Sequence, residues 1–307
     1  MKFLITALSN TRDCFVEYFS YIKYLFETHG HTVNFCFYNN NTNINNIDSK
    51  YDCIIFTRLL PNIKLLNQYK NMTEQFAYLN TEQFSSEFHK KECIKNFQVL
   101  SNLSTNETVK LHPVIHLDYS KKNIELIKNQ IKSGRFFLIP YGINPQEITT
   151  SIKKEKSGCF LGPMSPHREK ILDQTKKEDM KINRLKGWGK ERDNRLFKNA
   201  ILINIHKDIS RFRVFEEIRC NRCLYNGMMV ISEKSLMDTE HPLFKRISWF
   251  DGKEDFKRVV NNAFENYEEY LKQFDFKKIR EEMIAYSEHQ LFLASLKQKE
   301  SIDNKNQ

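Results

Sequence analysis

Residues 198–233 read KNAILINIHKDISRFRVFEEIRCNRCLYNGMMVISE, which is two apolar runs separated by a charged segment. The first run, 201–205, has the β-branched bias of a parallel strand that is covered on both faces. A second strand is predicted at 228–231. Between them, Asn226 and Gly227 end a predicted helix whose apolar residues recur at helical spacing: Phe212, Val214, Phe215, Ile218 and Leu224. The stretch therefore predicts a strand–helix–strand unit.

Polar residues stand at the carboxyl end of each of these two strands. Asn204 and His206 close the first strand, and Ser232 and Glu233 close the second. Because ligands bind at the carboxyl ends of the strands in open α/β sheets, these residues are candidates for a binding site. Alternatively, His206 is a structural residue whose ring nitrogens are hydrogen-bonded within the protein.

Strands and helices alternate along the rest of the chain in the same way. The predicted strands lie at 3–8, 32–37, 52–56, 76–79, 97–100, 136–139, 158–161, 182–185 and 247–250. A charged segment, 146–156, interrupts the alternation. We therefore predict an α/β protein with two facing Rossmann-like domains, 1–145 and 157–275, and a terminal helix within 276–300 that packs back across the cleft between them.

Composition narrows the class of protein. The chain has 307 residues, a net charge of +10 and seven cysteines. The positive charge favours anionic ligands, but the lysines are scattered, which argues against a nucleic-acid-binding face. The cysteines form no disulfide pattern, and Cys220 and Cys223 lie inside the predicted helix. No apolar run is long enough to span a bilayer, so we expect a cytoplasmic protein without a membrane span.

Further candidates lie in predicted turns. The turn 162–168 combines Gly162, an N-cap at Ser165 with Pro166 behind it, and the positive charge of Arg168. Anions bind readily at such a turn. Three cationic side chains are further candidates for phosphate binding: Lys186, Arg211 and Arg213. Trp188 is predicted to stack on a base or to fill an apolar gap. Glu82 follows the strand 76–79 and is either an acid at the site or a helix-capping carboxylate.

Together these residues resemble a GT-B-fold glycosyltransferase, in particular the small members of bacteria and large DNA viruses. The resemblance rests on KERDNRLFKNAILINIH, FEEIR and NGMMVISE between 190 and 233, with weaker matches at YLNTEQ and IPYGINP. It implies a nucleotide-sugar donor bound mainly by the C-terminal domain and an acceptor bound mainly by the N-terminal domain.

The resemblance also assigns roles to particular residues. The acid of the donor-binding helix corresponds to Glu216, with Glu217 as the competing choice, and Arg219 corresponds to the arginine after it. The familiar retaining pattern has two glutamates eight residues apart, but Val214 and Arg222 occupy those positions here. The sequence therefore leaves open whether the transfer retains or inverts the anomeric configuration of the sugar.

The predicted function is transfer of a sugar from a UDP- or GDP-sugar to a glycan, lipid or protein. The predicted catalytic residues are Glu82, Glu216 and His206. The donor and its phosphates would contact Lys186, Arg213, Arg219, Glu217, Ser232, Glu233, Gly162, Ser165 and Arg168. No Asp-x-Asp motif is present, so no metal or other cofactor is expected. The alternatives are a nucleic-acid-binding or -modifying protein and a non-catalytic module that binds a nucleotide or glycan.

Overall fold

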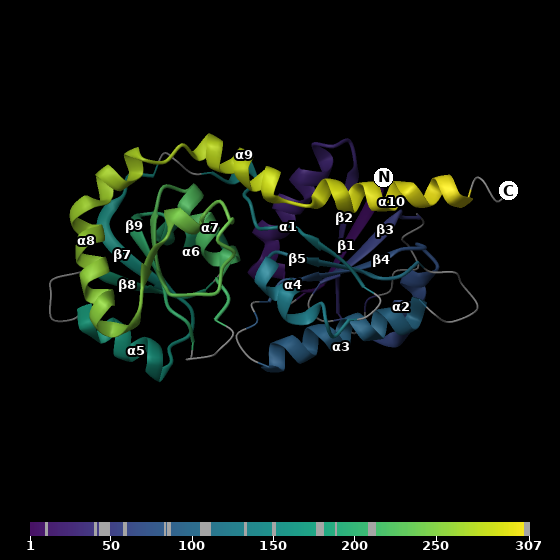
Figure 1. The fold of residues 1–307 in the computed structure, drawn as a ribbon, viewed down its shortest axis with the longest axis horizontal. Helices are drawn as coiled ribbons and strands as arrows, with labels where there is room; N and C mark the ends of the chain where they lie inside the picture. Colours follow the sequence, from purple (N-terminus) through teal and green to yellow (C-terminus); the bar gives the residue numbers. More distant parts are fainter. Residues whose placement is uncertain are drawn as a thin grey trace. The chain divides into compact units, whose positions relative to one another are not determined.

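The computed structural model describes residues 1–9, 12–39, 42, 50–57, 60–82, 84, 87–104, 112–131, 134–148, 152–175, 181–187, 189–207 and 213–303. The chain divides into two compact units. Unit 1 comprises Met1–Pro140 and Ser287–Gln307, and unit 2 comprises Tyr141–Tyr286. Each unit contains one parallel sheet with helices around it (Figure 1). The predicted fold class, α/β with two parallel-sheet domains, is confirmed.

Unit 1 is built on a six-stranded sheet with the order β2-β1-β3-β4-β5-β6, and all its strand pairs are parallel. Every residue of the central strands β3 and β4 is buried, as expected where helices cover both faces. The strands are β1 (Lys2–Leu8), β2 (Thr32–Tyr38), β3 (Cys53–Thr57), β4 (Phe76–Asn80), β5 (Ile115–Asp118) and β6 (Arg135–Leu138).

The described part of unit 1 contains five α-helices: α1 (Arg12–Glu27), α2 (Ile63–Lys70), α3 (Glu87–Ser104), α4 (Lys121–Ile127) and α10 (His289–Asp303). The last of them comes from the far end of the chain. Phe292 of α10 is fully buried, and its ring centroid lies 5.8 Å from that of Phe137 and 5.9 Å from that of Phe26. Helix α10 is therefore part of the unit 1 core.

Unit 2 has a five-stranded parallel sheet with the order β11-β10-β9-β7-β8. Alternate residues of its strands enter two different apolar clusters. Phe160, Ile201 and Ile203 pack with α5 and α8, whereas Leu161 and Leu202 pack with α6, α7 and α9. The elements are β7 (Glu155–Leu161), α5 (Pro166–Leu172), β8 (Ile182–Leu185), α6 (Gly189–Leu196), β9 (Asn199–Asn204), α7 (Glu217–Tyr225), β10 (Met229–Glu233), β11 (Ser248–Phe250), α8 (Gly252–Lys272) and α9 (Phe276–Tyr286).

Two strand predictions in unit 1 were wrong. Residues 97–100 lie in α3, where Cys93, Phe97 and Leu100 are buried at helical spacing. The strand that occupies this place in the sheet is β5, which sequence reasoning missed because two of its four residues, His116 and Asp118, are polar and interrupt the apolar run. A short apolar run does not by itself distinguish a strand from a buried turn of helix.

Helix α7 starts later than predicted. Val214 forms an isolated parallel bridge with Leu236, and the N–H of Phe215 donates to the Leu236 carbonyl at 3.1 Å. This pairing holds the segment extended, so the helix begins only at Glu217. Phe212 lies outside the described residues.

The terminal segment also differs from the prediction, because 276–300 contains two helices instead of one. The chain leaves the helical path at Glu288, whose N–H donates to the Leu138 carbonyl and whose carboxylate accepts from the Leu138 N–H, both at 2.7 Å. These two bonds satisfy the backbone of the edge strand β6. The boundary between the units falls at Pro140, before the charged segment that was predicted to link two domains.

Candidate functional site

The carboxyl ends of three strands of unit 2 meet at one edge of its sheet. Asn204 at the end of β9 pairs in register with Ser232 of β10, and Gly162 follows β7, the other neighbour of β9. The amide of Asn204 donates to the hydroxyl oxygen of Ser232 at 3.0 Å. This edge brings together most of the residues predicted to bind a donor.

Glu233 is the centre of that edge. Its side chain is only 3% exposed, yet it accepts from the N–H of His206 at 3.0 Å and from the Nε2 of His167 at 2.9 Å. The Nη1 of Arg213 lies 3.8 Å from the same carboxylate. Glu233 therefore fixes three segments relative to one another: the start of α5, the loop after β9 and the loop before α7. Sequence reasoning missed His167.

His206 is buried and serves as a hydrogen-bond donor. The Ser235 hydroxyl donates to the Glu233 carbonyl at 2.8 Å, and the Nε2 of His206 lies 2.8 Å from that hydroxyl oxygen. Since the hydroxyl proton is already used, Nε2 carries the imidazole proton and Nδ1 is unprotonated. Burial, and after it the charges of the neighbouring arginines, lower the pKa of His206 to about 3. The ring is therefore neutral at physiological pH.

Two arginines at this edge are partly exposed. The Nη1 of Arg219 donates to the side-chain oxygen of Asn204 at 3.0 Å and pairs with the carboxylate of Glu216. The side chains of Arg219 and Arg213 are 21% and 34% exposed. Gly162, at φ +119°, lies directly beside Arg219, since a Cβ there would be 3.6 Å from Nη2. Both guanidinium groups are therefore accessible from solvent, although each lies beside a carboxylate.

Arg168 and Ser165 have structural roles that their prediction as phosphate ligands did not include. The guanidinium group of Arg168 is buried and donates to the carbonyl oxygens of Ile205 (2.8 Å), His206 (3.2 Å) and Pro163 (2.7 Å). Ser165 caps α5, as the sequence predicted, and its hydroxyl donates to the carbonyl of Lys207. Both residues thus brace the loop after β7 against the loop after β9.

The structure separates the two glutamates between which the sequence left the choice open. Glu217 is 3% exposed, and its carboxylate lies 3.3 Å from the Nε2 of His241. The Nδ1 of His241 accepts from the N–H of Leu243, so Nε2 carries the proton that faces Glu217. Glu216 precedes the first residue of α7 and has 23% of its side chain exposed. Glu216 is therefore the more accessible acid.

Glu82 belongs to unit 1 and lies directly after β4, half-buried. Its N–H donates to the side-chain oxygen of Asn80 at 3.1 Å, and its carbonyl accepts from the amide of Asn123 at 3.1 Å. Asn123 and the buried Asp118 beneath it were missed by sequence reasoning because β5 was missed. The available signal was the position of Asp118 directly after the short run 114–117.

The architecture of the chain matches that of solved glycosyltransferases. It aligns with an alpha-glucosyltransferase in complex with UDP over 100% of both chains, with a TM-score of 0.57 and 13% identity. It aligns with the sucrose-phosphate synthase of Thermosynechococcus elongatus over 96% of this chain and 100% of that one, with a TM-score of 0.52 and 9% identity. The chain has the GT-B fold. At these identities the likeness concerns the fold alone.

The relatives of this GT-B chain by sequence are viral. One uncharacterised protein of Acanthamoeba polyphaga mimivirus is 33% identical over 168 residues, which are 52% of this chain and 49% of that protein. A second protein of the same virus is 35% identical over 134 residues, which are 41% of this chain and 14% of that protein. The chain thus spans about half the length of the first relative and less of the second. No protein-family model matches it.

Two remaining predictions concern the rim of this edge. Lys186 is exposed and follows the edge strand β8, and its carbonyl accepts from Arg195 at 3.4 Å. Trp188 and Arg211 lie outside the described residues. Within the described ranges, no three His, Cys, Asp or Glu side chains are grouped to hold a metal ion. The helices of that part of the chain are also too short or too polar to cross a bilayer.

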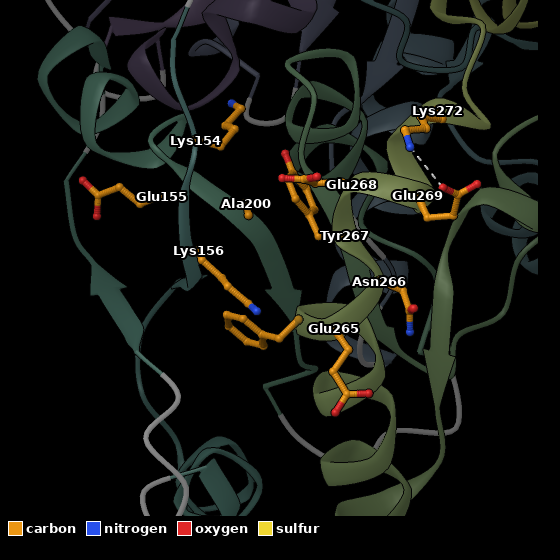
Figure 2. A pocket seen from close by; sticks show the side chains of 11 residues that line it. Lys154, Glu155, Lys156, Ala200, Glu265, Asn266, Tyr267, Glu268, Glu269 and Lys272 are labelled. Carbon is orange, nitrogen blue, oxygen red and sulfur yellow. Dashed lines mark hydrogen bonds and ion pairs between the residues drawn. The ribbon is translucent and has the colours of Figure 1, made fainter.

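A hollow of about 370 Å³ lies at the other end of the unit 2 sheet. Figure 2 shows Lys154 and Lys156 on one wall, beside the start of β7, and Tyr267 of α8 on the other. Helix α8 is kinked at Asn266, which also lines the hollow. Burial lowers the pKa of Lys154 to about 8. Because these residues lie near the amino ends of β7 and β9, the hollow is separate from the candidate site.

Proposed function

We propose that this GT-B chain is a glycosyltransferase that uses a UDP-sugar or a related nucleotide sugar and needs no metal ion. One observation carries the proposal: the partly exposed pair Arg213 and Arg219 lies at the carboxyl edge of the unit 2 sheet, where ligands of open α/β sheets bind. A solved alpha-glucosyltransferase with the same fold binds UDP.

The chemistry of the donor fits this edge. As the bond between the sugar and the diphosphate breaks, negative charge grows on the diphosphate oxygens. Guanidinium groups stabilise that charge through short, paired hydrogen bonds, which is the task otherwise given to a metal ion. We assign this role to Arg213 and Arg219. Lys186 would add charge at the rim.

The carboxylates of unit 2 have separate tasks in this proposal. Glu216 lies beside Arg219 and would accept hydrogen bonds from hydroxyls of the ribose or the transferred sugar. Glu233 and Ser232 hold the strand ends in place, and Glu217 is held by His241. His206, being neutral, would contribute a polar wall and no charge.

The acceptor would be a hydroxyl-bearing glycan, lipid or protein. Its hydroxyl must approach the anomeric carbon of the sugar with a group nearby that accepts the hydrogen. We assign this role to Glu82 of unit 1, a carboxylate at the carboxyl edge of the other sheet.

The test is a thermal-shift panel of UDP, GDP, CMP and their sugar conjugates, with Mg²⁺ or with EDTA. A ligand at 100 times its Kd adds about 2.7 kcal/mol to the stability of the native state. We expect a clear rise in Tm with UDP or UDP-sugars that EDTA leaves unchanged. Release of nucleoside diphosphate from the best donor then tests transfer.

Three other outcomes would contradict the proposal. A rise in Tm that requires Mg²⁺ would contradict the proposal that the protein needs no metal ion. A flat nucleotide panel with a shift for single-stranded or duplex DNA would favour the nucleic-acid alternative. Tight binding of a donor without release of the diphosphate, with any acceptor, would favour a non-catalytic binding module.

A further inference from the structure

A fully buried carboxylate lies at the carboxyl edge of unit 1. Asp118, the last residue of β5, is 0% exposed. One of its oxygens accepts from the N–H of Ser120 at 2.9 Å and from the amide of Asn123 at 3.0 Å. The other accepts from the amide of Asn80 at 2.9 Å and from the Nε2 of His116 at 3.2 Å. Four donors thus replace the water that an ionised carboxylate loses on burial.

The same two amides also hold the turn after β4. Asn80 and Asn123 both donate to the carbonyl oxygen of Glu82, at 2.9 and 3.1 Å. The side-chain oxygen of Asn80 accepts from the N–H of Glu82 at 3.1 Å, and that of Asn123 accepts from the N–H of Phe84 at 3.4 Å. Both hydrogens of each amide are therefore used, one on Asp118 and one on Glu82. We name Asp118, Asn80 and Asn123 the turn clamp.

His116 completes the clamp from the apolar side. An ionised Asp118 offers only acceptors, so the Nε2 of His116 carries the proton that faces it. The Nδ1 atom of His116 is buried without a hydrogen-bond partner among the described residues. The imidazole ring packs against the rings of Tyr78, Phe97 and Phe136, with centroids 5.8, 6.1 and 5.3 Å away. This packing fixes the His116 ring. Because the Nε2 of that ring is bonded to Asp118, it also keeps the carboxylate turned toward the two amides.

Among the described residues of the clamped turn, one side chain reaches the surface. Asn80, Thr81 and Phe84 are at most 3% exposed, whereas Glu82 is half-buried and reaches the surface. Surface turns are seldom held by a buried charge and two fully bonded amides, because a hydrogen bond on the surface competes with water. Active sites are held in this way, since a reacting group must keep its place to within a fraction of an ångström.

We infer that Asp118, through Asn80 and Asn123, is a positioning residue that holds Glu82 where it binds the hydroxyl group of the acceptor. The inference rests on the proposed transferase function and extends it to unit 1. It predicts that the clamp controls use of the acceptor and leaves donor binding alone, because the unit 2 edge is built from other residues.

The decisive experiment is a double-mutant cycle of Asp118→Asn and Glu82→Gln. The donor is the nucleotide sugar with the largest thermal shift, and the acceptors are water and a panel of p-nitrophenyl glycosides. Release of the nucleoside diphosphate is measured. We expect each single variant to lower kcat/KM for the acceptor by roughly 10- to 100-fold, and the double variant to be no more than about threefold worse than Glu82→Gln alone. The Kd of UDP should stay within about twofold of wild type in all three variants, because the unit 2 edge is built from other residues. A twofold change corresponds to only a few tenths of a kcal/mol.

A matched control separates positioning from general stability. Asn199 is also a buried amide with its bonds satisfied, accepting from Ser157 at 2.9 Å, but it lies at the start of β9 in unit 2. Asn199→Ala should lower Tm without changing the acceptor kinetics. Should Asp118→Asn fail to fold, Asn123→Ala takes its place in the cycle, because it removes one amide of the clamp and leaves Asp118 three donors.

Two results overturn the inference. In one, the fold losses in kcat/KM caused by Asp118→Asn and by Glu82→Gln multiply in the double variant, which would show that Asp118 acts independently of Glu82. In the other, Asp118→Asn leaves kcat/KM for every acceptor unchanged. If the wild-type protein releases no diphosphate from any donor that it binds, the proposed function fails instead, and the two failures are thereby distinguished.

Discussion

The carboxyl edges of the two sheets handle charge in opposite ways. At the unit 1 edge, one buried carboxylate accepts four hydrogen bonds, and these bonds fix a turn. At the unit 2 edge, Arg213 and Arg219 are paired with Glu233 and Glu216 but stay partly exposed. The turn clamp preserves geometry and, because Asp118 is fully buried, offers no charge to a ligand. A partly exposed ion pair can exchange its partner for an anion, so the comparison assigns positioning to unit 1 and anion binding to unit 2.

The largest expected effect that tests this comparison comes from Arg219→Met. Losing a charge-assisted hydrogen bond costs about 1.5–3 kcal/mol, so UDP should bind roughly 10- to 100-fold more weakly, as measured by calorimetry. The control is Arg258→Met, which removes the same charge from the exposed face of α8, where Arg258 pairs with Asp255. If Arg219→Met binds UDP as tightly as the wild-type protein, the assignment of anion binding to the unit 2 edge is wrong.

Acid should weaken both units through buried histidines. Burial lowers the pKa of His206 in unit 2 to about 3 and that of His289 in unit 1 to about 4. A depressed histidine pKa stabilises the fold above the unfolded value of about 6.5, and that stability is lost as the pH falls toward the folded value. Between pH 7.5 and pH 5, each histidine should cost about 2 kcal/mol.

Tryptophan fluorescence during urea unfolding can assign these losses to the units. Both tryptophans of the chain, Trp188 and Trp249, belong to unit 2. The fluorescence midpoint should therefore depend less on pH in His206→Gln and keep its dependence in His289→Gln. Hydrogen exchange of α10 should show the reverse. The same pH dependence of fluorescence in His206→Gln as in the wild-type protein would contradict the assignment.

The smallest expected effect comes from Gly162→Ala at the unit 2 edge. A Cβ there would lie 3.0 Å from the Nη1 of Arg168, at a φ of +119° that L-residues rarely adopt. We expect a loss of about 1–2 kcal/mol in urea unfolding and a several-fold rise in the Kd of UDP, as the arginines shift. Gly252→Ala is the control, since its φ is +77° but nothing lies within 4 Å of the new Cβ. If both variants bind UDP equally well, Gly162 does not help to place the arginines.

The fold of unit 2 and the grouping of its candidate residues at one edge of the sheet could be predicted because the signal is local. Apolar runs of β9 and β10 are followed directly by polar residues, and Ser165 and Pro166 mark the start of α5. The roles of single residues could not be predicted in the same way. Arg168 donates to Ile205, which is 37 positions away in the sequence, so only the tertiary structure shows that this guanidinium braces loops.

Unit 1 shows the opposite outcome, in that the candidate Glu82 was predicted but its surroundings were not. The apolar residues of α3 between 93 and 100 also suit a strand, and the polar residues His116 and Asp118 interrupt the apolar pattern of β5. Without β5 there was no reason to connect Asp118 with Asn80, which is adjacent to it only across the sheet register. Hydrogen-bond networks of this kind are set by strand order, which no local pattern contains.

The position of α10 has a consequence for the order in which the chain folds during its synthesis. Unit 1 needs Phe292 for its core and Glu288 for the edge of its sheet, and both residues emerge after all of unit 2. Unit 2 is one continuous segment, so its sheet can close first. Unit 1, whose six strands are made before unit 2, therefore completes its core after unit 2 and leaves Leu138 of β6 without its partner until Glu288 has been made.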